Sequence, residues 1–166
     1  MDRELSLVVY HSPLFPAHWA LYIPSMTDPA IGKIVHVTGD ARNGFVHEFK
    51  RGYLPADDER GHSIIPLARI SASHVVDVLS PSGLLVYTAP DDNLLALAVD
   101  NVERELLSIP APGKSLNVVD SLGRSQGRKV AIKNCQTWIR DAVERLVHAG
   151  IVPQEALGIV DAAPKN

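Results

Sequence analysis

The first fifty residues constrain the fold most, because they contain four short apolar segments separated by turn-forming residues. Pro, Gly, Asp or Asn bounds each segment, and segments of this length that are rich in Val, Ile and Tyr are typical of β-strands. The predicted strands are Leu5–Tyr10, His18–Ile23, Lys33–Thr38 and Phe45–Lys50. Consecutive strands joined by turns predict an antiparallel meander.

The middle of the chain continues with a polar turn and a further apolar run. Ala56–Gly61 ("ADDERG") predicts a solvated turn, and Ser63–Ile70 predicts another strand. Pro66 lies inside this run, and proline cannot donate a ladder hydrogen bond, so the strand is expected at a sheet edge or a bulge. Ser73 is then expected to cap a short helix, His74–Leu79.

The second half of the chain predicts helices around a long connection. Asp92 is expected to cap a helix whose face is defined by residues near helical spacing: Leu94, Leu97, Ala98, Asn101, Val102 and Leu106. Pro110–Lys129 contains "PAPGKS", which lacks the first glycine of a phosphate-binding Walker loop, so we interpret it as a surface connection. "PQEALGIVDA" predicts a last short helix.

The clearest helical pattern begins at the only cysteine, Cys135, and stops at Gly150 and Pro153. Its apolar face consists of Cys135, Trp138, Ile139, Ala142, Val143 and Leu146. On this face a cysteine is commonly a small buried hydrophobe. Asn134, however, is a favourable N-cap, and the first turn of a helix stabilises a thiolate. Cys135 is therefore either a packing residue or a nucleophile.

Two histidines on the predicted strands are candidate partners for that cysteine. Strand alternation places His18 on one face with Ala20 and Tyr22, and His36 on one face with its strand neighbours. If the two strands pair, the imidazoles lie side by side, as a general base and the group that orients it. His47 shares a face with phenylalanines and is interpreted as packed, although a different register would make it the orienting group instead.

Composition restricts the classes of partner. The 166 residues fit one domain, 1–166, with 46% hydrophobic and 21% charged residues. A net charge of −3 gives no basic surface, so nucleic acid is not expected as a partner, whereas a small-molecule or peptide substrate is. One cysteine cannot form an internal disulfide, the acidic first residues are not expected to act as a secretory signal, and no apolar run nears the roughly 18 residues of a membrane span. These features predict a cytoplasmic protein without stable membrane insertion. Its oligomeric state is open.

Three blocks resemble a known family. "HWALYI", "IVHVTGD" and "NCQTWIRD" follow the order of motifs in the lecithin retinol acyltransferase and phospholipid acyltransferase group, a circularly permuted branch of the NlpC-type papain-like thiol enzymes. The resemblance implies Cys135 as nucleophile, His18 as base and His36 as orienting group, with the backbone N–H of Cys135 at an oxyanion site. The departures are a longer interval between the histidines, Gln136 in place of an acid, and no C-terminal membrane anchor. They leave the lipid substrate open.

The expected fold is α+β and papain-like, a small antiparallel sheet packed against helices that include the one starting at Cys135. The expected activity is a cysteine-dependent hydrolase or acyltransferase that acts on an amide or (thio)ester without cofactor or metal, because no C-x-x-C or H-x-x-x-H pair supports a zinc site. A peptide or isopeptide hydrolase and a small-molecule acyltransferase are equally compatible. The alternatives are a non-catalytic binding module with Cys135 as a core residue, and a homodimeric scaffold. Asp40 is interpreted as a turn residue.

Overall fold

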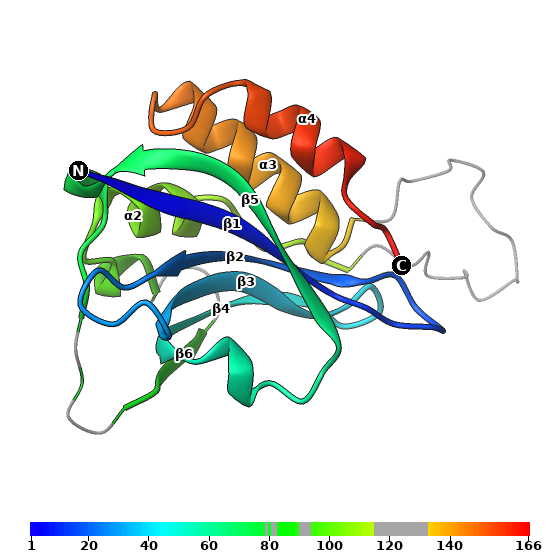
Figure 1. Cartoon of the computed structure of the whole chain (residues 1–166). Helices are drawn as coiled ribbons and strands as arrows, with labels where there is room; N and C mark the ends of the chain where they lie inside the picture. Colours follow the sequence, from blue (N-terminus) through cyan, green and yellow to red (C-terminus); the bar gives the residue numbers. More distant parts are fainter. Residues whose placement is uncertain (79, 81–82, 90–93, 115–132) are drawn as a thin grey trace, which may run out of the picture.

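The computed structural model describes residues 1–78, 80, 83–89, 94–114 and 133–166. These residues form an α+β fold with one six-stranded antiparallel sheet and three α-helices (Figure 1). The strand order is β5-β1-β2-β3-β4-β6. The strands are β1 (Asp2–Tyr10), β2 (His18–Pro24), β3 (Gly32–Asp40), β4 (Gly44–Tyr53), β5 (His62–Ser71) and β6 (Leu85–Ala89).

The meander predicted for the first half is confirmed, since β1 to β4 pair in sequence order. β5 folds back beside β1 as an edge strand, and its register with β1 shifts between Leu5 and Ser6, opposite Pro66 and Ala68. Both expectations for Pro66, an edge and a bulge, are met. Asp40 is also confirmed as a turn residue, because its carboxylate accepts from the N–H groups of Arg42 and Asn43.

The helices α3 (Cys135–His148) and α4 (Glu155–Ala162) lie together over one face of the sheet, with α2 (Asn101–Leu107) beside α3 (Figure 1). Gly150, at a φ of +72°, ends the α3 segment in a conformation that favours glycine. The predicted C-terminal helices are therefore confirmed. No helix in the described ranges is long and apolar enough to cross a membrane.

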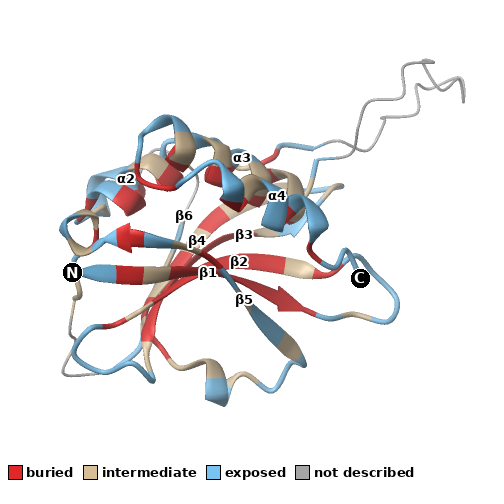
Figure 2. Cartoon of the chain, turned by 45° about the horizontal axis from the view of Figure 1, so that its top comes forward, coloured by how far each residue is buried: buried red, intermediate tan, exposed pale blue. Residues whose placement is uncertain are grey.

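The two faces of the sheet carry different clusters of buried side chains. Figure 2 marks the buried residues in red along the central strands and on the helices. The face toward the helices contributes the odd-numbered residues of β1 and β2, including Leu7 and Trp19, to one core with α3 and α4. The opposite face has a smaller buried cluster: Val8, Tyr10, Ala20, Tyr22, Ile34 and Tyr53. This second face has no α-helix above it in the described structure. Two residues between β4 and β5 contact its tyrosines: Asp58 accepts from Tyr53, and Arg60 lies over Tyr10.

Two helix predictions in the middle of the chain are wrong. After Ser71, which caps in place of Ser73, only a 3-10 turn forms at Ala72–His74, and the described residues after it are not helical. The long helix after Asp92 is also interrupted: a 3-10 turn at Leu95–Leu97 precedes α2, which Asp100 caps by accepting from the N–H of Glu103. Leu79, Asp92 and most of the connection Pro110–Lys129 lie outside the described residues.

The strand β6 was absent from the sequence prediction. Within the described sheet it pairs only with β4, from His47–Ala89 to Arg51–Leu85, and it is five residues long. A segment this short becomes a strand because β4 supplies its hydrogen bonds. The local sequence does not reveal that pairing.

Candidate functional site

The cysteine begins α3 as its capping pattern predicts. Asn134 is the N-cap, and its side chain accepts from the backbone N–H groups of Gln136 and Thr137. The Thr137 hydroxyl in turn accepts from the Asn134 N–H at 2.7 Å, which completes a capping box. Cys135 is therefore fixed at the first helical position, where the helix leaves N–H groups without intrahelical acceptors.

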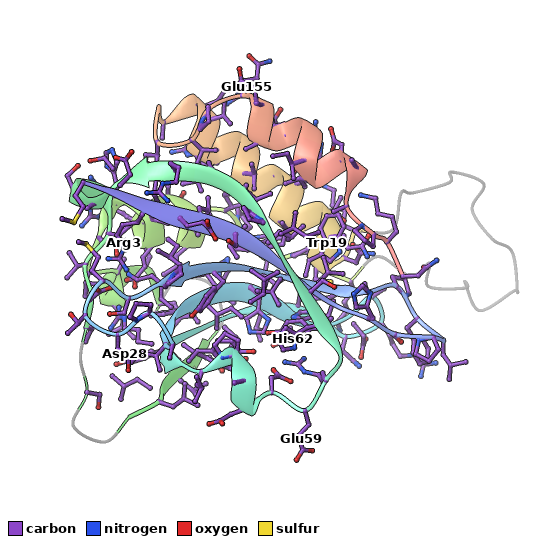
Figure 3. All side chains as sticks on the ribbon, viewed as in Figure 1. Arg3, Trp19, Asp28, Glu59, His62 and Glu155 are labelled. Carbon is purple, nitrogen blue, oxygen red and sulfur yellow. The ribbon has the colours of Figure 1, made fainter. Side chains whose placement is uncertain are left out.

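The sulfur of Cys135 contacts the main chain of β2 on both sides of His18. Its thiol points at the carbonyl oxygen of Ala17, 3.9 Å away, and the N–H of Trp19 is directed at the sulfur. Figure 3 shows Trp19 beside the beginning of α3. The residue is 8% exposed, and this burial raises the pKa of the Cys135 thiol, although the nearby backbone N–H groups oppose the shift.

A gap in the β-ladder makes room for the start of α3. The paired register of β2 and β3 begins at Leu21–Val35, so within the described sheet His18, Trp19 and Ala20 have no ladder partner on β3. The start of α3 and the last residues of the chain lie there instead: the carbonyl of Ala17 accepts from Cys135 and Gln136, and its N–H donates to the carbonyl of Lys165 at 2.8 Å. The cysteine is thus inserted at a point where two strands separate.

The two predicted histidines are brought together on the opposite face. His18 Nε2 lies 2.6 Å from His36 Nδ1, and His36 Nε2 lies 2.9 Å from Glu48 Oε1. Glu48 is the direct neighbour of His36 across β3 and β4. Sequence reasoning missed Glu48, although its position in the fourth predicted strand opposite His36 could have been found by aligning the two strands across their turn.

Matching donors to acceptors assigns the protons in this relay. Accepting the hydrogen bond of His36 lowers the pKa of Glu48 to about 2, so Glu48 is an anion and His36 Nε2 carries the proton. Burial lowers the pKa of His36, so the ring is neutral and its Nδ1 can only accept. His18 Nε2 is then the donor to His36. Burial, and secondly His36, lower the pKa of His18 to about 3, which leaves a lone pair on its Nδ1.

The relay has a wall of aromatic and charged residues that the sequence analysis did not identify. Tyr10 is stacked on His18 with ring centroids 5.6 Å apart, and the Tyr10 hydroxyl lies 2.8 Å from that of Tyr53. Arg60 lies over the Tyr10 ring at 3.9 Å and binds Asp58. The "ADDERG" segment is therefore more than a solvated turn, because two of its residues pack against the histidine face.

A pocket of about 560 Å³ opens beside this wall. Its lining includes Lys50, Tyr53, Asp58 and Arg60, all of which also contact the wall or the relay. Figure 3 shows Glu59 and His62 on this side of the sheet, away from α3 and α4. Its volume is in the range of small-molecule sites, roughly 300–1,000 Å³.

The structure does not join Cys135 and His18 through their side chains. Their side chains form no hydrogen bond with each other in the described residues, since the sulfur belongs to the core on the helix side and the imidazole to the other face. His47 is not near His18 either. It is fully buried against Trp138, and its Nε2 lies 2.6 Å from the carbonyl of Ile109. The interpretation of His47 as a packed residue is confirmed.

Gln136 has a structural reason for being an amide. Its Nε2 donates to the carbonyl oxygens of Ala17 and Lys165, at 2.8 and 2.9 Å. A carboxylate in this place would only accept and could donate to neither carbonyl. Gln136 therefore ties the start of α3 to β2 and to the last residues of the chain.

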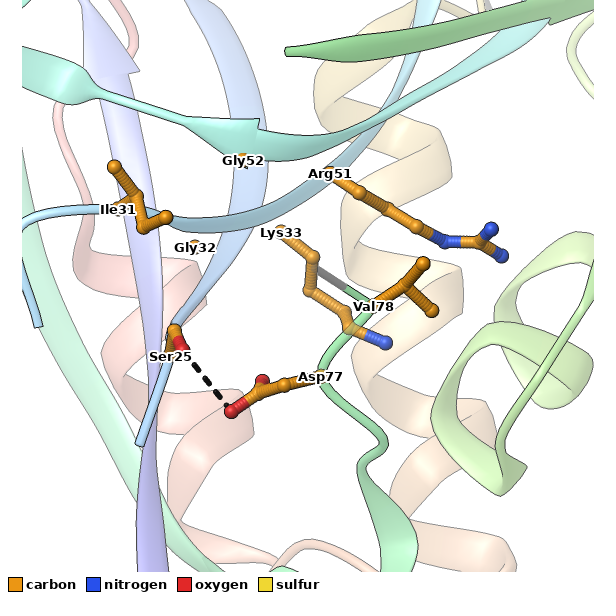
Figure 4. A pocket seen from close by; sticks show the side chains of 8 residues that line it. All are labelled: Ser25, Ile31, Gly32, Lys33, Arg51, Gly52, Asp77 and Val78. Atoms are coloured by element: carbon orange, nitrogen blue, oxygen red, sulfur yellow. Dashed lines mark hydrogen bonds between the residues drawn. The ribbon is translucent and has the colours of Figure 1, made fainter. Parts of the chain in front are cut away.

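A second buried polar cluster lies at the far end of the sheet. Lys33 contacts both Asp100 and Glu103, and Arg51 binds Glu103 at 2.8 Å. The cluster borders a pocket of about 20 Å³, which also has Ser25 in its lining (Figure 4). That volume holds about one water molecule, so the cluster ties α2 to the sheet and offers no ligand site.

Among the described residues, no group of three or more His, Cys, Asp or Glu side chains has the geometry to hold a metal ion.

The comparisons with known proteins identify a family and no activity. Neither the curated proteins nor the solved structures contain a match to this sequence or structure. A family model does match residues 5–153, so the chain belongs to DUF6540, a family of unknown function.

Proposed function

We propose that the chain is a cysteine-dependent hydrolase or acyltransferase with the papain-like arrangement of the permuted NlpC type. One observation carries the proposal: the sulfur at the first position of α3 lies against the backbone flanking His18, whose ring belongs to a relay with His36 and Glu48. A nucleophile, a base and an orienting chain thus converge on one residue of β2. The strand–strand–helix order of these groups also supports a papain-like fold.

The protonation states support general-base activation of a neutral thiol. The Cys135 thiol is protonated at neutral pH because burial raises its pKa, and His18 has an unprotonated Nδ1. In the reaction His18 Nδ1 takes the thiol proton as the sulfur attacks the substrate carbonyl. This transfer requires the two side chains to turn toward each other at the open end of the β2–β3 ladder, since they lie on opposite faces of β2 in this structure. The same nitrogen then protonates the leaving group, which gives a thioester on Cys135. Water or an amine attacks this thioester, and His18 accepts and returns a proton in the second half.

The groups around the sulfur also suit the charge that develops. The N–H of Cys135 belongs to the first turn of α3, where no intrahelical acceptor is available, whereas the N–H of Gln136 already donates to Asn134. An oxyanion formed at the attacked carbonyl would be stabilised there. The pocket beside Tyr53 and Arg60 is the candidate for the rest of the substrate, because residues that line it also contact the relay or Tyr10: Lys50 contacts Glu48, and Arg60 lies over Tyr10.

Trapping the acyl-enzyme tests this function. We expect 4-nitrophenyl acetate to acetylate Cys135, seen as a mass increase on the peptide that contains it. His18→Gln should slow acetylation by about 10²- to 10⁴-fold, as loss of a general base does. The control is His148→Gln at an exposed position on the same helix as Cys135. Acetylation that is unchanged in His18→Gln, or that persists on other residues in Cys135→Ala, contradicts the proposal.

A second candidate function is a binding module that keeps Cys135 as a core residue. The low exposure of the sulfur and the missing hydrogen bond between Cys135 and His18 favour it. In that case Cys135→Ala should lower the free energy of unfolding while His18→Gln leaves every property of the thiol unchanged. The acetylation experiment separates the two candidates, since only the enzyme forms an adduct at Cys135.

A further inference from the structure

Backbone pairing does not fix the two histidines relative to each other. The ladder between β2 and β3 starts only at Leu21–Val35, so His18 and His36 approach each other across the gap. A single hydrogen bond of 2.6 Å joins their rings. His18 is paired with β1 but not with β3, so its imidazole can change rotamer on the open side unless a neighbouring side chain restricts it.

Tyr10 is the side chain that restricts His18. It is the cross-strand partner of His18 on β1, and the two rings are stacked at 5.6 Å with an interplanar angle of 28°. Directly opposed residues on antiparallel strands interact through their side chains on the shared face. Tyr10 is 3% exposed, so its ring is itself held in place.

A closed ring of interactions holds Tyr10. Its hydroxyl donates to Tyr53, and the Tyr53 hydroxyl donates to Asp58 at 2.9 Å. Asp58 accepts two hydrogen bonds from the guanidinium of Arg60, at 2.8 and 2.6 Å. The guanidinium of Arg60 closes the ring of contacts, because it lies over the Tyr10 ring at 3.9 Å. Each member is thus fixed by two others.

We propose that Tyr10 is a positioning residue for His18: clamped by Arg60 and Tyr53, its ring keeps the His18 imidazole bonded to His36 with Nδ1 available as the base. The inference rests on the proposed role of His18. It adds to the site a pair of residues, Tyr10 and Arg60, that touch no reacting atom and act through His18. The Pro55–Asp57 turn and the residues after it are then part of the catalytic apparatus.

Nitrogen NMR of the histidine rings tests the proposal without any substrate. In the wild-type protein we expect His18 as the Nε2–H tautomer, with an Nε2 proton protected from exchange. Tyr10→Phe keeps the ring and should keep this signature. Tyr10→Leu removes the wall and should give a mixture of tautomers and loss of the protected proton. An unchanged signature in folded Tyr10→Leu overturns the proposal.

Arg60→Ala supplies a second test that does not disturb the buried face. Arg60 has a half-exposed side chain, so its removal should leave the fold intact while loosening Tyr10 and speeding exchange of the His18 Nε2 proton. Arg69→Ala, at an exposed position on β5, is the matched control and should have no effect. Equal exchange rates in the two variants overturn the proposal even if Tyr10→Leu does not fold.

The charged groups that face His18 must be considered when these spectra are read against pH. They are His36, Glu48 and Lys50 on the neighbouring strands, and Arg60 before β5. Measurements at pH 7.5 keep both imidazoles neutral and isolate the positional effect. The same spectra in a Cys135→Ala background separate the two proposals. If Cys135 is not acetylated but Tyr10→Leu still changes the His18 tautomer, the thiol-enzyme function is refuted and the positioning of His18 by Tyr10 remains.

Discussion

His18 Nε2 donates to His36 Nδ1 over 2.6 Å, and this direction is set by the carboxylate of Glu48 at the other end of the relay. Because the Glu48 carboxylate can only accept, each imidazole donates a hydrogen bond from Nε2 to the next member of the relay. The lone pair that remains is on His18 Nδ1, the ring nitrogen nearest the backbone. The carboxylate of Glu48, which is two hydrogen bonds away from His18, therefore determines which His18 nitrogen is free to act as a base.

Replacing Glu48 by Gln should disturb this order. The amide can turn its NH₂ group toward His36 Nε2, which permits the reversed tautomers and places a proton on His18 Nδ1. We expect acetylation of Cys135 to slow by up to about 10²- to 10⁴-fold. Lys50→Gln is the matched control, since Lys50 contacts the same carboxylate at 3.4 Å without entering the relay. Equal rates in the two variants would count against the relay.

Acid should destabilise the fold from an unusually high pH. The pKa of His18 is lowered from 6.5 to about 3, so below pH 6.5 the unfolded chain binds a proton that the folded protein excludes. The pKa of Glu48 falls from 4.5 to about 2, so its contribution is present above pH 4.5 and is lost between 4.5 and 2. The free energy of unfolding in urea should decrease as the pH falls from 6.5.

His18→Gln tests the histidine part of that decrease. The variant should flatten the pH dependence between 6.5 and 4.5, where the carboxylate of Glu48 is still ionised in both states. His148→Gln, at the exposed end of α3, provides the comparison. A pH dependence that is identical in both variants would show that His18 is not held neutral by its surroundings.

The thiol of Cys135 should react slowly in the native protein. Because burial raises its pKa, alkylation by iodoacetamide should be slow at pH 6 to 7 and accelerate as the pH rises above the ordinary range of a thiol. The same protein in denaturant should label at the rate of a simple thiol. Fast native labelling at pH 6 would instead indicate a thiolate paired with a protonated histidine, and would refute the neutral pair.

Gln136→Glu should weaken the attachment of α3. The carboxylate cannot donate to Ala17 or Lys165, so two carbonyl groups lose their donor and face an anion. We expect a loss of about 1–3 kcal/mol in the free energy of unfolding. Gln154→Glu makes the same chemical change at an exposed residue whose side chain caps no helix, and should be nearly neutral.

Lys33→Met should be the most destabilising of these changes. It leaves the buried carboxylates of Asp100 and Glu103 with fewer cations, and breaking a buried ion pair costs about 3–5 kcal/mol. Adding Asp100→Asn removes one of the uncompensated charges and retains an N-cap for α2, so the double variant should recover part of the loss. Chemical denaturation measures both, and a double variant less stable than Lys33→Met would contradict this account.

Local elements whose signals lie within a few residues could be predicted before any tertiary contact was known. Alternation and turn residues predicted β1 to β4, Pro66 predicted an irregular edge strand, and Asn134 predicted the start of α3. Alternation also placed His18 and His36 on one face. These predictions succeeded because the period of side chains along a strand or helix is fixed by backbone geometry.

Which of these groups meet in space depends on the fold as a whole. Glu48 reaches His36 through the register of β3 and β4, Arg60 reaches Tyr10 through the return of β5, and β6 exists because β4 offers it a free edge. The gap between β2 and β3, which brings the Cys135 sulfur against the backbone of β2, depends on where a ladder stops. Such contacts follow from long-range pairing and packing, which no short stretch of sequence encodes.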